Sequence, residues 1–259
     1  MLIHHLKILI FVWFIALMLV AQPASFAKST TLAQQLLQRY QTIETISCEI
    51  QKTTKGTSTV RMLSRVVYKR PYFINVENVS PANRRIIVDG KNLYYYQKNA
   101  AKGFSKPIEE LNETWMASVR NIPATPVEHL LKMKDIPEIK LPGNTNFAIR
   151  VAYKTDTSFV ILSCNTPDRL ERIEFFKDSG MQNKLAEYKY SKFFEKEGAY
   201  SIPCLHDAFM IMPDGSKIVE KRYIHNLKVN TPVNDHFFNP ELFFKDVEFV
   251  ADFSKTYHY

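Results

Sequence analysis

The spacing of apolar residues changes along the chain from a helical repeat to a strict alternation. Between Thr30 and Ile46, apolar residues recur every three or four positions, which predicts an amphipathic helix whose start Thr30 or Thr31 can cap. From Val60 to Lys69 the period falls to two, with apolar residues on one face and basic residues on the other. That alternation predicts a half-buried strand.

Turn residues divide most of the remaining chain into short strands. Pro71 ends the first alternation, and Asp89-Gly90 predicts a hairpin turn between two further strands. Two short helices are expected over 112–121 and 125–134, and many strands follow them. This order indicates an α+β fold, and frequent hairpin turns favour an antiparallel sheet. We expect an open, incomplete antiparallel β-barrel whose concave face is filled or covered by the helices.

The first 27 residues have the three parts of a secretory signal peptide. Met1–Lys7 is a short basic start, Ile8–Val20 is apolar throughout, and small residues lead to Ala27. A membrane-spanning helix needs about 20 apolar residues, and this run is shorter. We predict cleavage near Ala27 and export, with an uncleaved N-terminal anchor as the alternative.

Charge and cysteine content narrow the classes of partner and chemistry. The formal net charge is +8, but the basic residues are spread along the predicted strands, which favours a solvated surface over a site for anionic lipid headgroups or nucleic acid. Three cysteines, Cys48, Cys164 and Cys204, allow one disulfide in an exported protein. We expect Cys164 to pair with Cys204, because both fall in or near strand-like segments. The absence of a C-x-x-C pair argues against zinc or thioredoxin chemistry.

Reactive residues do not form a recognisable catalytic set in the sequence. Neither G-x-S-x-G nor H-E-x-x-H occurs. Cys204 and His206 can share one face of a strand, but a packed thiol or a disulfide explains this pair as well as catalysis does. His129, beside Glu128, is expected on the surface of a short helix. We therefore predict a protein that is not an enzyme, needs no cofactor and holds no metal.

Several short motifs, taken in their order along the chain, resemble the LolA-like carriers of outer-membrane lipoproteins. They are a first helix followed by Ser47–Lys55, then Lys69-Arg70-Pro71, the hairpin Val88–Tyr96, Thr125-Pro126 before Leu130-Leu131, Asn230-Thr231-Pro232-Val233 and Phe238-Asn239-Pro240. The resemblance covers most of residues 30–245. The segment 193–215 and the chain after Val250 are additions to the family pattern.

This resemblance implies an incomplete β-barrel closed by helices around a hydrophobic cavity for acyl chains. After the signal peptide over 1–27, it implies a lipid- or lipoprotein-binding domain over 28–250 and a C-terminal tail over 251–259. Arg70 stands where the family's arginine holds the helical lid closed by hydrogen bonds. Because each buried CH₂ gains roughly 0.8 kcal/mol, such a cavity needs apolar walls rather than reactive groups. The expected wall residues are Tyr68, Phe73, Tyr95, Trp115, Met116, Leu131 and Phe147.

The expected function is that of a soluble periplasmic carrier or sensor for the acyl chains of lipoproteins or lipids. It would move them across the cell envelope as a monomer, with transport proteins of the inner and outer membranes as partners and without binding nucleic acid. One alternative is an envelope regulatory or structural module of the same fold that binds a protein partner. A secreted hydrolase is the other, which the lack of a catalytic set disfavours.

Overall fold

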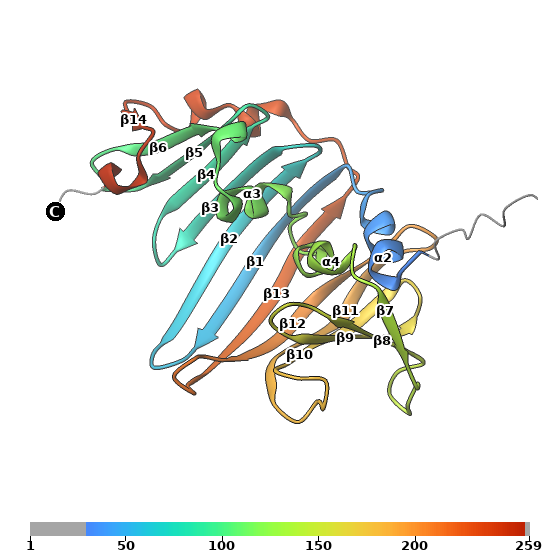
Figure 1. Ribbon diagram of the computed structural model, residues 1–259. Coiled ribbons are helices and arrows are strands. Elements are labelled where there is room, and N and C mark those ends of the chain that lie inside the picture. Colours follow the sequence, from blue (N-terminus) through green and yellow to red (C-terminus); the bar gives the residue numbers. More distant parts are fainter. Residues whose placement is uncertain (1–29, 257–259) are drawn as a thin grey trace, which may run out of the picture. The chain divides into compact units, whose positions relative to one another are not determined.

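A single sheet of 14 strands carries most of the computed structural model, which describes residues 30–256 (Figure 1). The predicted signal peptide and residues 257–259 lie outside the described residues. In chain order the strands are β1 (Thr45–Lys55), β2 (Thr59–Lys69), β3 (Phe73–Ser80), β4 (Arg84–Asp89), β5 (Asn92–Gln97), β6 (Gly103–Pro107), β7 (Glu138–Leu141), β8 (Ile149–Lys154), β9 (Phe159–Thr166), β10 (Arg169–Phe176), β11 (Lys184–Lys196), β12 (Tyr200–Ile211), β13 (Lys217–Val229) and β14 (Phe249–Val250).

The order of strands across the sheet brings early and late parts of the chain together. It runs β14-β6-β5-β4-β3-β2-β1-β13-β12-β11-β10-β9-β8-β7, so β1 pairs with β13 near the middle. Neighbouring strands are antiparallel except for β14 and β6, which are parallel. The predicted open antiparallel sheet is therefore confirmed. Its two outermost strands are not hydrogen-bonded to each other, so the sheet stays open.

Three α-helices lie among the described residues: α2 (Leu32–Tyr40), α3 (Glu113–Arg120) and α4 (Val127–Met133). Helix α2 begins at a capping box, in which the Thr31 hydroxyl accepts from Gln34 N and the Gln34 amide oxygen accepts from Thr31 N. The predicted helix over 30–46 is too long at its end, because the chain turns after Tyr40 and enters β1. Both short helices occur close to where the sequence places them.

The main core lies between α2, α4 and one face of the sheet, which we call the inner face (Figure 1). Leu36 of α2, Leu130 of α4 and Tyr153 of β8 are almost completely buried there. The Tyr153 hydroxyl accepts from Ala33 N at 3.1 Å, and the Tyr40 hydroxyl donates to Ser201 O at 3.0 Å. These contacts fix α2 on the β7–β12 half of the sheet. No helix of residues 30–256 is both long enough and apolar enough to cross a membrane.

The C-terminal segment passes from the outer face of the sheet around its β6 edge to the inner face (Figure 1). It contains three 3₁₀ helices, η2 (Asp235–Phe238), η3 (Pro240–Leu242) and η4 (Phe253–Thr256). Phe238 contacts the outward-facing ring of Phe73 at 5.5 Å between centroids. Beyond β14, Phe253 reaches Trp115 of α3 at 5.9 Å. The chain after Val250 is thus packed against the domain at least as far as Thr256.

Candidate functional site

A cavity of about 520 Å³, here called the sheet cavity, lies between strands β1–β4 and helix α3. Alternate residues of neighbouring strands point to the same face, so a row of cross-strand partners forms a continuous floor. Val66 pairs with Val76, and Val76 pairs with Ile86. The apolar floor residues are Ile50, Met62, Val66, Ile74, Val76 and Ile86. The facing wall comes from α3 and the loop after it: Thr114, Ala117, Ser118, Asn121, Pro123 and Ala124.

One edge of the sheet cavity is polar and carries basic groups. Ser64 pairs with Asn78, and Asn78 pairs with Arg84, in the row next to the apolar one. In the amide orientation that satisfies both neighbours, Asn78 donates to Ser64 Oγ at 2.6 Å and accepts from the Arg84 guanidinium. The row of Ser64, Asn78 and Arg84 therefore forms a hydrogen-bonded polar rim beside the apolar floor.

Two further cations of this rim share a single carboxylate. Glu220 lies 2.6 Å from Lys52 Nζ and 2.8 Å from Arg222 Nη2. Burial raises the pKa of Glu220, but the hydrogen bonds and charges of Lys52 and Arg222 outweigh burial, and the net shift is downward. Arg222 Nε is buried and has no hydrogen-bond partner among residues 30–256.

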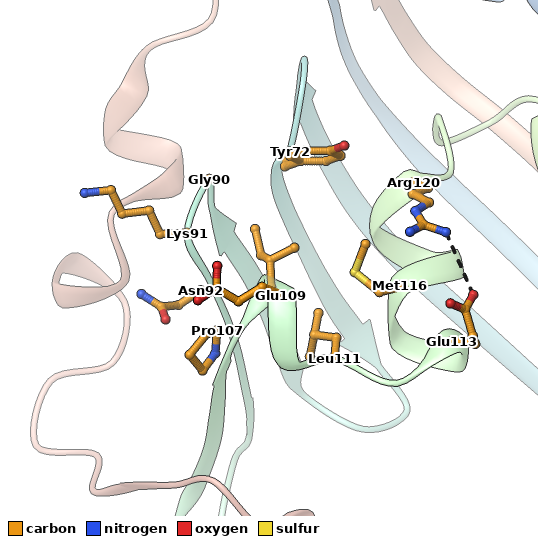
Figure 2. Close-up of a pocket in the computed structure, with 11 residues that line it drawn as sticks. Tyr72, Gly90, Lys91, Asn92, Pro107, Glu109, Leu111, Glu113, Met116 and Arg120 are labelled. Atoms are coloured by element: carbon orange, nitrogen blue, oxygen red, sulfur yellow. Dashed lines mark ion pairs between the residues drawn. The ribbon is translucent and has the colours of Figure 1, made fainter.

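A second pocket, here called the turn pocket, adjoins another face of α3 and has a volume of about 720 Å³. Figure 2 shows Met116 projecting from α3 toward Leu111 and Tyr72, with the ion pair between Glu113 and Arg120 on the other side of the helix. Residues 114, 117, 118 and 121 face the sheet cavity instead. Helix α3 therefore separates two cavities, and Val119 is its one buried residue.

Arg70 fastens the end of α2 to the sheet. Its Nε donates to Ile43 O at 3.1 Å, its Nη2 donates to Tyr40 O at 3.3 Å, and Glu44 lies 3.8 Å from Nε. The last carbonyls of a helix lack helical partners, and a guanidinium fork can supply donors to them. In this structure the Arg70 side chain contacts α2 and its following turn. Its role in holding a lid over a ligand stays a prediction.

The seven expected wall residues are spread over several places, and none of them lines the sheet cavity. Met116 lines the turn pocket. Tyr95 and Trp115 contact each other at 6.2 Å and belong to an aromatic cluster with Phe104 and Phe253. Tyr68 is buried and Leu131 partly buried, and both pack in the main core.

The other two expected wall residues lie away from both cavities. Phe73 alternates with the inward-facing Ile74 and therefore points to the outer face, where it meets Phe238. Phe147 precedes β8 and lies under the Arg172 guanidinium at 4.8 Å. The residues that do line the sheet cavity are mostly aliphatic and occupy the same alternating set as Tyr68. Contact between the seven expected residues and a ligand stays a prediction.

The predicted disulfide between Cys164 and Cys204 is wrong. Cys48, Cys164 and Cys204 are all free thiols. Cys164 lies on β9 and Cys204 on β12, with β10 and β11 between them. Each step between strands is about 4.8 Å, so the two Cα atoms lie well beyond the roughly 7 Å that a disulfide can span. Burial raises the pKa of both Cys48 and Cys164 to about 12.

The two histidines near α4 are held in apolar surroundings. The ring of His206 packs against Tyr190 at 5.0 Å, and its Nε2 lies 3.0 Å from Pro203 O. His129 packs against Tyr188 at 4.5 Å, so it is less exposed than the sequence suggested. Burial lowers the pKa of each histidine to about 4. Within residues 30–256, no group of three or more His, Cys, Asp or Glu side chains is arranged to hold a metal ion.

Sequence and structure comparisons differ in what they detect. No protein-family model and no curated protein matches the sequence. An outer membrane lipoprotein-sorting protein domain from Vibrio parahaemolyticus superposes with a TM-score of 0.53 at 12% identity, over 81% of this chain and 97% of that chain. A DUF1329 family protein from Desulfovibrio piger gives 0.52 at 11% identity, over 82% and 97%. A LolA superfamily protein from Nitrosomonas europaea gives 0.49 at 13% identity, over 81% and 98%. With its large open, mostly antiparallel sheet and three described α-helices, the chain has a LolA-like fold.

Proposed function

We propose that the protein is a carrier or sensor that binds the acyl chains of lipoproteins or lipids in the sheet cavity. The observation that carries this proposal is the aliphatic floor of Ile50, Val66, Ile74, Val76 and Ile86 beneath a loosely packed helix. Its volume of about 520 Å³ falls within the range of roughly 300–1,000 Å³ typical of ligand sites. The LolA-like fold, shared with a lipoprotein-sorting domain, supports the same conclusion.

In this proposal, α3 is the wall that moves. It buries one residue, Val119, and has a cavity against each of two faces. Apart from Val119 and the ring contacts of Trp115, α3 makes few buried apolar contacts, which means a low free energy of local opening. An outward displacement of α3 would join the sheet cavity to the turn pocket and lengthen the space for an acyl chain. Asn112, whose side chain caps α3, and Pro123, beyond its end, would bound the moving segment.

Binding of this kind needs burial and no reactive group, so the proposed protein is a carrier or sensor and not an enzyme. It would work in the periplasm, where the predicted signal peptide would deliver it. Its partners would be lipoproteins or lipids, together with membrane proteins that load and unload them. A regulatory or structural module that binds another protein through the same fold is the competing hypothesis.

Filling the sheet cavity tests the proposal directly. Ala117 faces the cavity from α3, so Ala117→Trp places an indole where an acyl chain would lie. We expect binding of a BODIPY-labelled C16 fatty acid, followed by fluorescence anisotropy, to weaken at least about tenfold, or 1.4 kcal/mol. Glu197→Trp, in the exposed turn after β11, is the matched control and should bind as the parent does. A parent that takes up no probe would contradict the proposal and favour the protein-partner hypothesis.

A further inference from the structure

We propose that the ligand of the sheet cavity is an amphiphile with an anionic headgroup, and that Arg84 binds this headgroup. This inference rests on the proposed function, because it assigns a ligand class to the same cavity. Carboxylate and phosphate headgroups share the required chemistry. Each is a planar or tetrahedral set of oxygen acceptors that a guanidinium can bind through two hydrogen bonds.

The cavity floor has an aliphatic row and a polar row, which match the apolar chain and the polar headgroup of an amphiphile. Val66, Val76 and Ile86 form one row across β2, β3 and β4. The next inward-facing row on the same strands is Ser64, Asn78 and Arg84. Two residues along a strand span roughly 7 Å, so the floor changes from aliphatic to polar within about one side chain. An acyl chain lying over the aliphatic row would therefore bring its headgroup to Arg84.

The charges around this end of the cavity leave Arg84 without a counter-ion. Glu220 pairs with both Lys52 and Arg222, and Glu128 on the α4 side pairs with Lys132 at 3.6 Å. Arg84 makes no ion pair with any residue between 30 and 256, and its polar contact is the neutral amide of Asn78.

The rim as a whole is cationic. Of the charged residues that line the cavity, Lys52, Arg84 and Arg222 are basic and Glu128 is acidic, and Glu220 pairs with Lys52 and Arg222. Besides the Arg84 guanidinium, Arg222 Nε is a hydrogen-bond donor with no acceptor among the described residues. A half-buried guanidinium without a carboxylate attracts an anion and repels a cationic headgroup. The unmatched positive charge thus specifies the sign of the headgroup, while the aliphatic row specifies the chain.

Competition among C16 amphiphiles that differ in headgroup tests this assignment. The full-length protein is loaded with the uncharged fluorophore N-phenyl-1-naphthylamine, which is then displaced by palmitate, palmitoyl-lysophosphatidylglycerol, palmitoyl-lysophosphatidylcholine or monopalmitoylglycerol. We expect the two anionic competitors to act at about tenfold lower concentration than monopalmitoylglycerol, as one charge-assisted hydrogen-bond pair would give. The better of palmitate and lysophosphatidylglycerol identifies whether a carboxylate or a phosphate is preferred.

Substitutions of Arg84 separate its charge from its volume. Arg84→Gln should abolish the anionic preference while changing displacement by monopalmitoylglycerol less than about twofold, and Arg84→Lys should keep part of the preference. The control is Arg61→Gln, which removes the same charge from an exposed position of β2 next to the inward-facing Met62. It should change neither the anionic preference nor displacement by monopalmitoylglycerol. Thermal unfolding by circular dichroism verifies that each variant is folded.

The possible outcomes distinguish this inference from the proposed function. Equal displacement by anionic and neutral amphiphiles, or an Arg84→Gln variant that keeps the preference, overturns the anionic headgroup but leaves acyl-chain binding standing. A parent protein that binds the naphthylamine probe and releases it to none of the C16 competitors overturns both. Preference for lysophosphatidylcholine over monopalmitoylglycerol that survives in Arg84→Gln would also overturn the role of Arg84, because the phosphate would then be bound elsewhere.

Discussion

Arg70 donates from Nε to the carbonyl oxygen of Ile43 over 3.1 Å. The Tyr40 carbonyl, its other acceptor, also accepts from Ile43 N, so Arg70→Leu deprives mainly Ile43 O of a donor. We expect the free energy of unfolding to fall by about 1 kcal/mol, near the lower limit for an orphaned and partly buried carbonyl. Urea titration followed by circular dichroism measures this. A loss above about 3 kcal/mol would show that Arg70 supports more than this turn.

The same variant tests the role that the family resemblance gives to Arg70. If Arg70 also restrains the lid, Arg70→Leu should exchange a bound fluorescent fatty acid faster than the parent at equal affinity. Stopped-flow displacement measures the rate. Arg65→Leu, an exposed arginine of β2, is the control for loss of charge. Equal exchange rates in the parent and in Arg70→Leu would limit Arg70 to a structural role at the end of α2.

Phe253 connects the C-terminal segment to α3. Its ring contacts Tyr95, Phe104 and Trp115 at centroid distances of 5.4–5.9 Å, although the residue remains 38% exposed. Phe253→Ala should lower stability by roughly 1–2 kcal/mol, less than the 3–5 kcal/mol of a fully buried phenylalanine. It should also shift the fluorescence of Trp115 to longer wavelength, because water reaches the indole.

Two further substitutions make that measurement specific. The other tryptophan of the chain, Trp13, lies in the predicted signal peptide, so Trp115 is the only reporter after cleavage near Ala27 or, in the uncleaved chain, after Trp13→Phe. Phe237→Ala removes a similarly exposed ring from η2, whose segment lies on the outer face against β3, and should leave the Trp115 spectrum unchanged. A spectrum of Phe253→Ala that matches the parent would contradict the contact between the C-terminal segment and α3.

The three thiols should differ in reactivity. Burial raises the pKa of Cys48 and Cys164 to about 12, and Cys204 is the least buried of the three. The thiolate is the reactive form, so Cys204 should react first with 5,5′-dithiobis(2-nitrobenzoate) at pH 8. Denatured protein should release three equivalents of chromophore. One equivalent would instead indicate a disulfide, and an unchanged fast phase in Cys204→Ser would contradict the assignment.

Acid should destabilise the protein before its carboxylates titrate. Burial lowers the pKa of His206 to about 4, whereas an unfolded histidine titrates near 6.5. Below pH 6.5 the unfolded state therefore binds more protons than the folded state, and stability falls until the pH reaches about 4. The total loss from this residue is on the order of 3 kcal/mol. His129 shifts in the same direction, and Arg222 disfavours protonation of both rings.

The contribution of His206 can be isolated by substitution. His206→Gln should flatten the dependence of the urea midpoint on pH between 6.5 and 4.5, and His225→Gln, an exposed histidine of β13, should not. An equal slope in the parent and in His206→Gln would mean that His206 is already protonated in the folded protein or that its surroundings open easily.

Helices, strands and turns were predicted from local sequence signals better than the contacts between them were. Asn112 accepts from Trp115 N and so starts α3 where its sequence suggests. Alternation likewise identified the face of β2 that carries Val66 and Tyr68. Which strands become neighbours depends on pairing over long separations, so β1 next to β13 was not evident. The disulfide prediction failed because β10 and β11, which lie between Cys164 and Cys204 in the chain, also lie between their strands in the sheet.

The candidate site shows the same limit. Arg70 stood out by its motif, and its donors do reach the end of a helix. Arg84 lies in no such motif. Its place in the polar row of the cavity follows from the pairing of Ser64, Asn78 and Arg84 across three strands. Among the aromatic residues chosen as cavity walls, Tyr68 and Tyr95 are buried in the core, because large rings gain most from complete burial, whereas Phe73 points to the outer face. Smaller aliphatic side chains were left to line the open space.

The short parallel strand β14 bears on whether the protein self-associates at high concentration. β14 pairs with Gly103 and Phe104 at the start of β6, where Gly103, lacking a side chain, lets the Phe249 ring approach closely. At the opposite end, β7 is four residues long and carries Glu138 and Lys140. Uncovered strand edges recruit other chains, and short or charged edges resist this. A chain cut before Phe249 would expose β6 as a template and should self-associate edge to edge, so the last strand acts as a guard against aggregation.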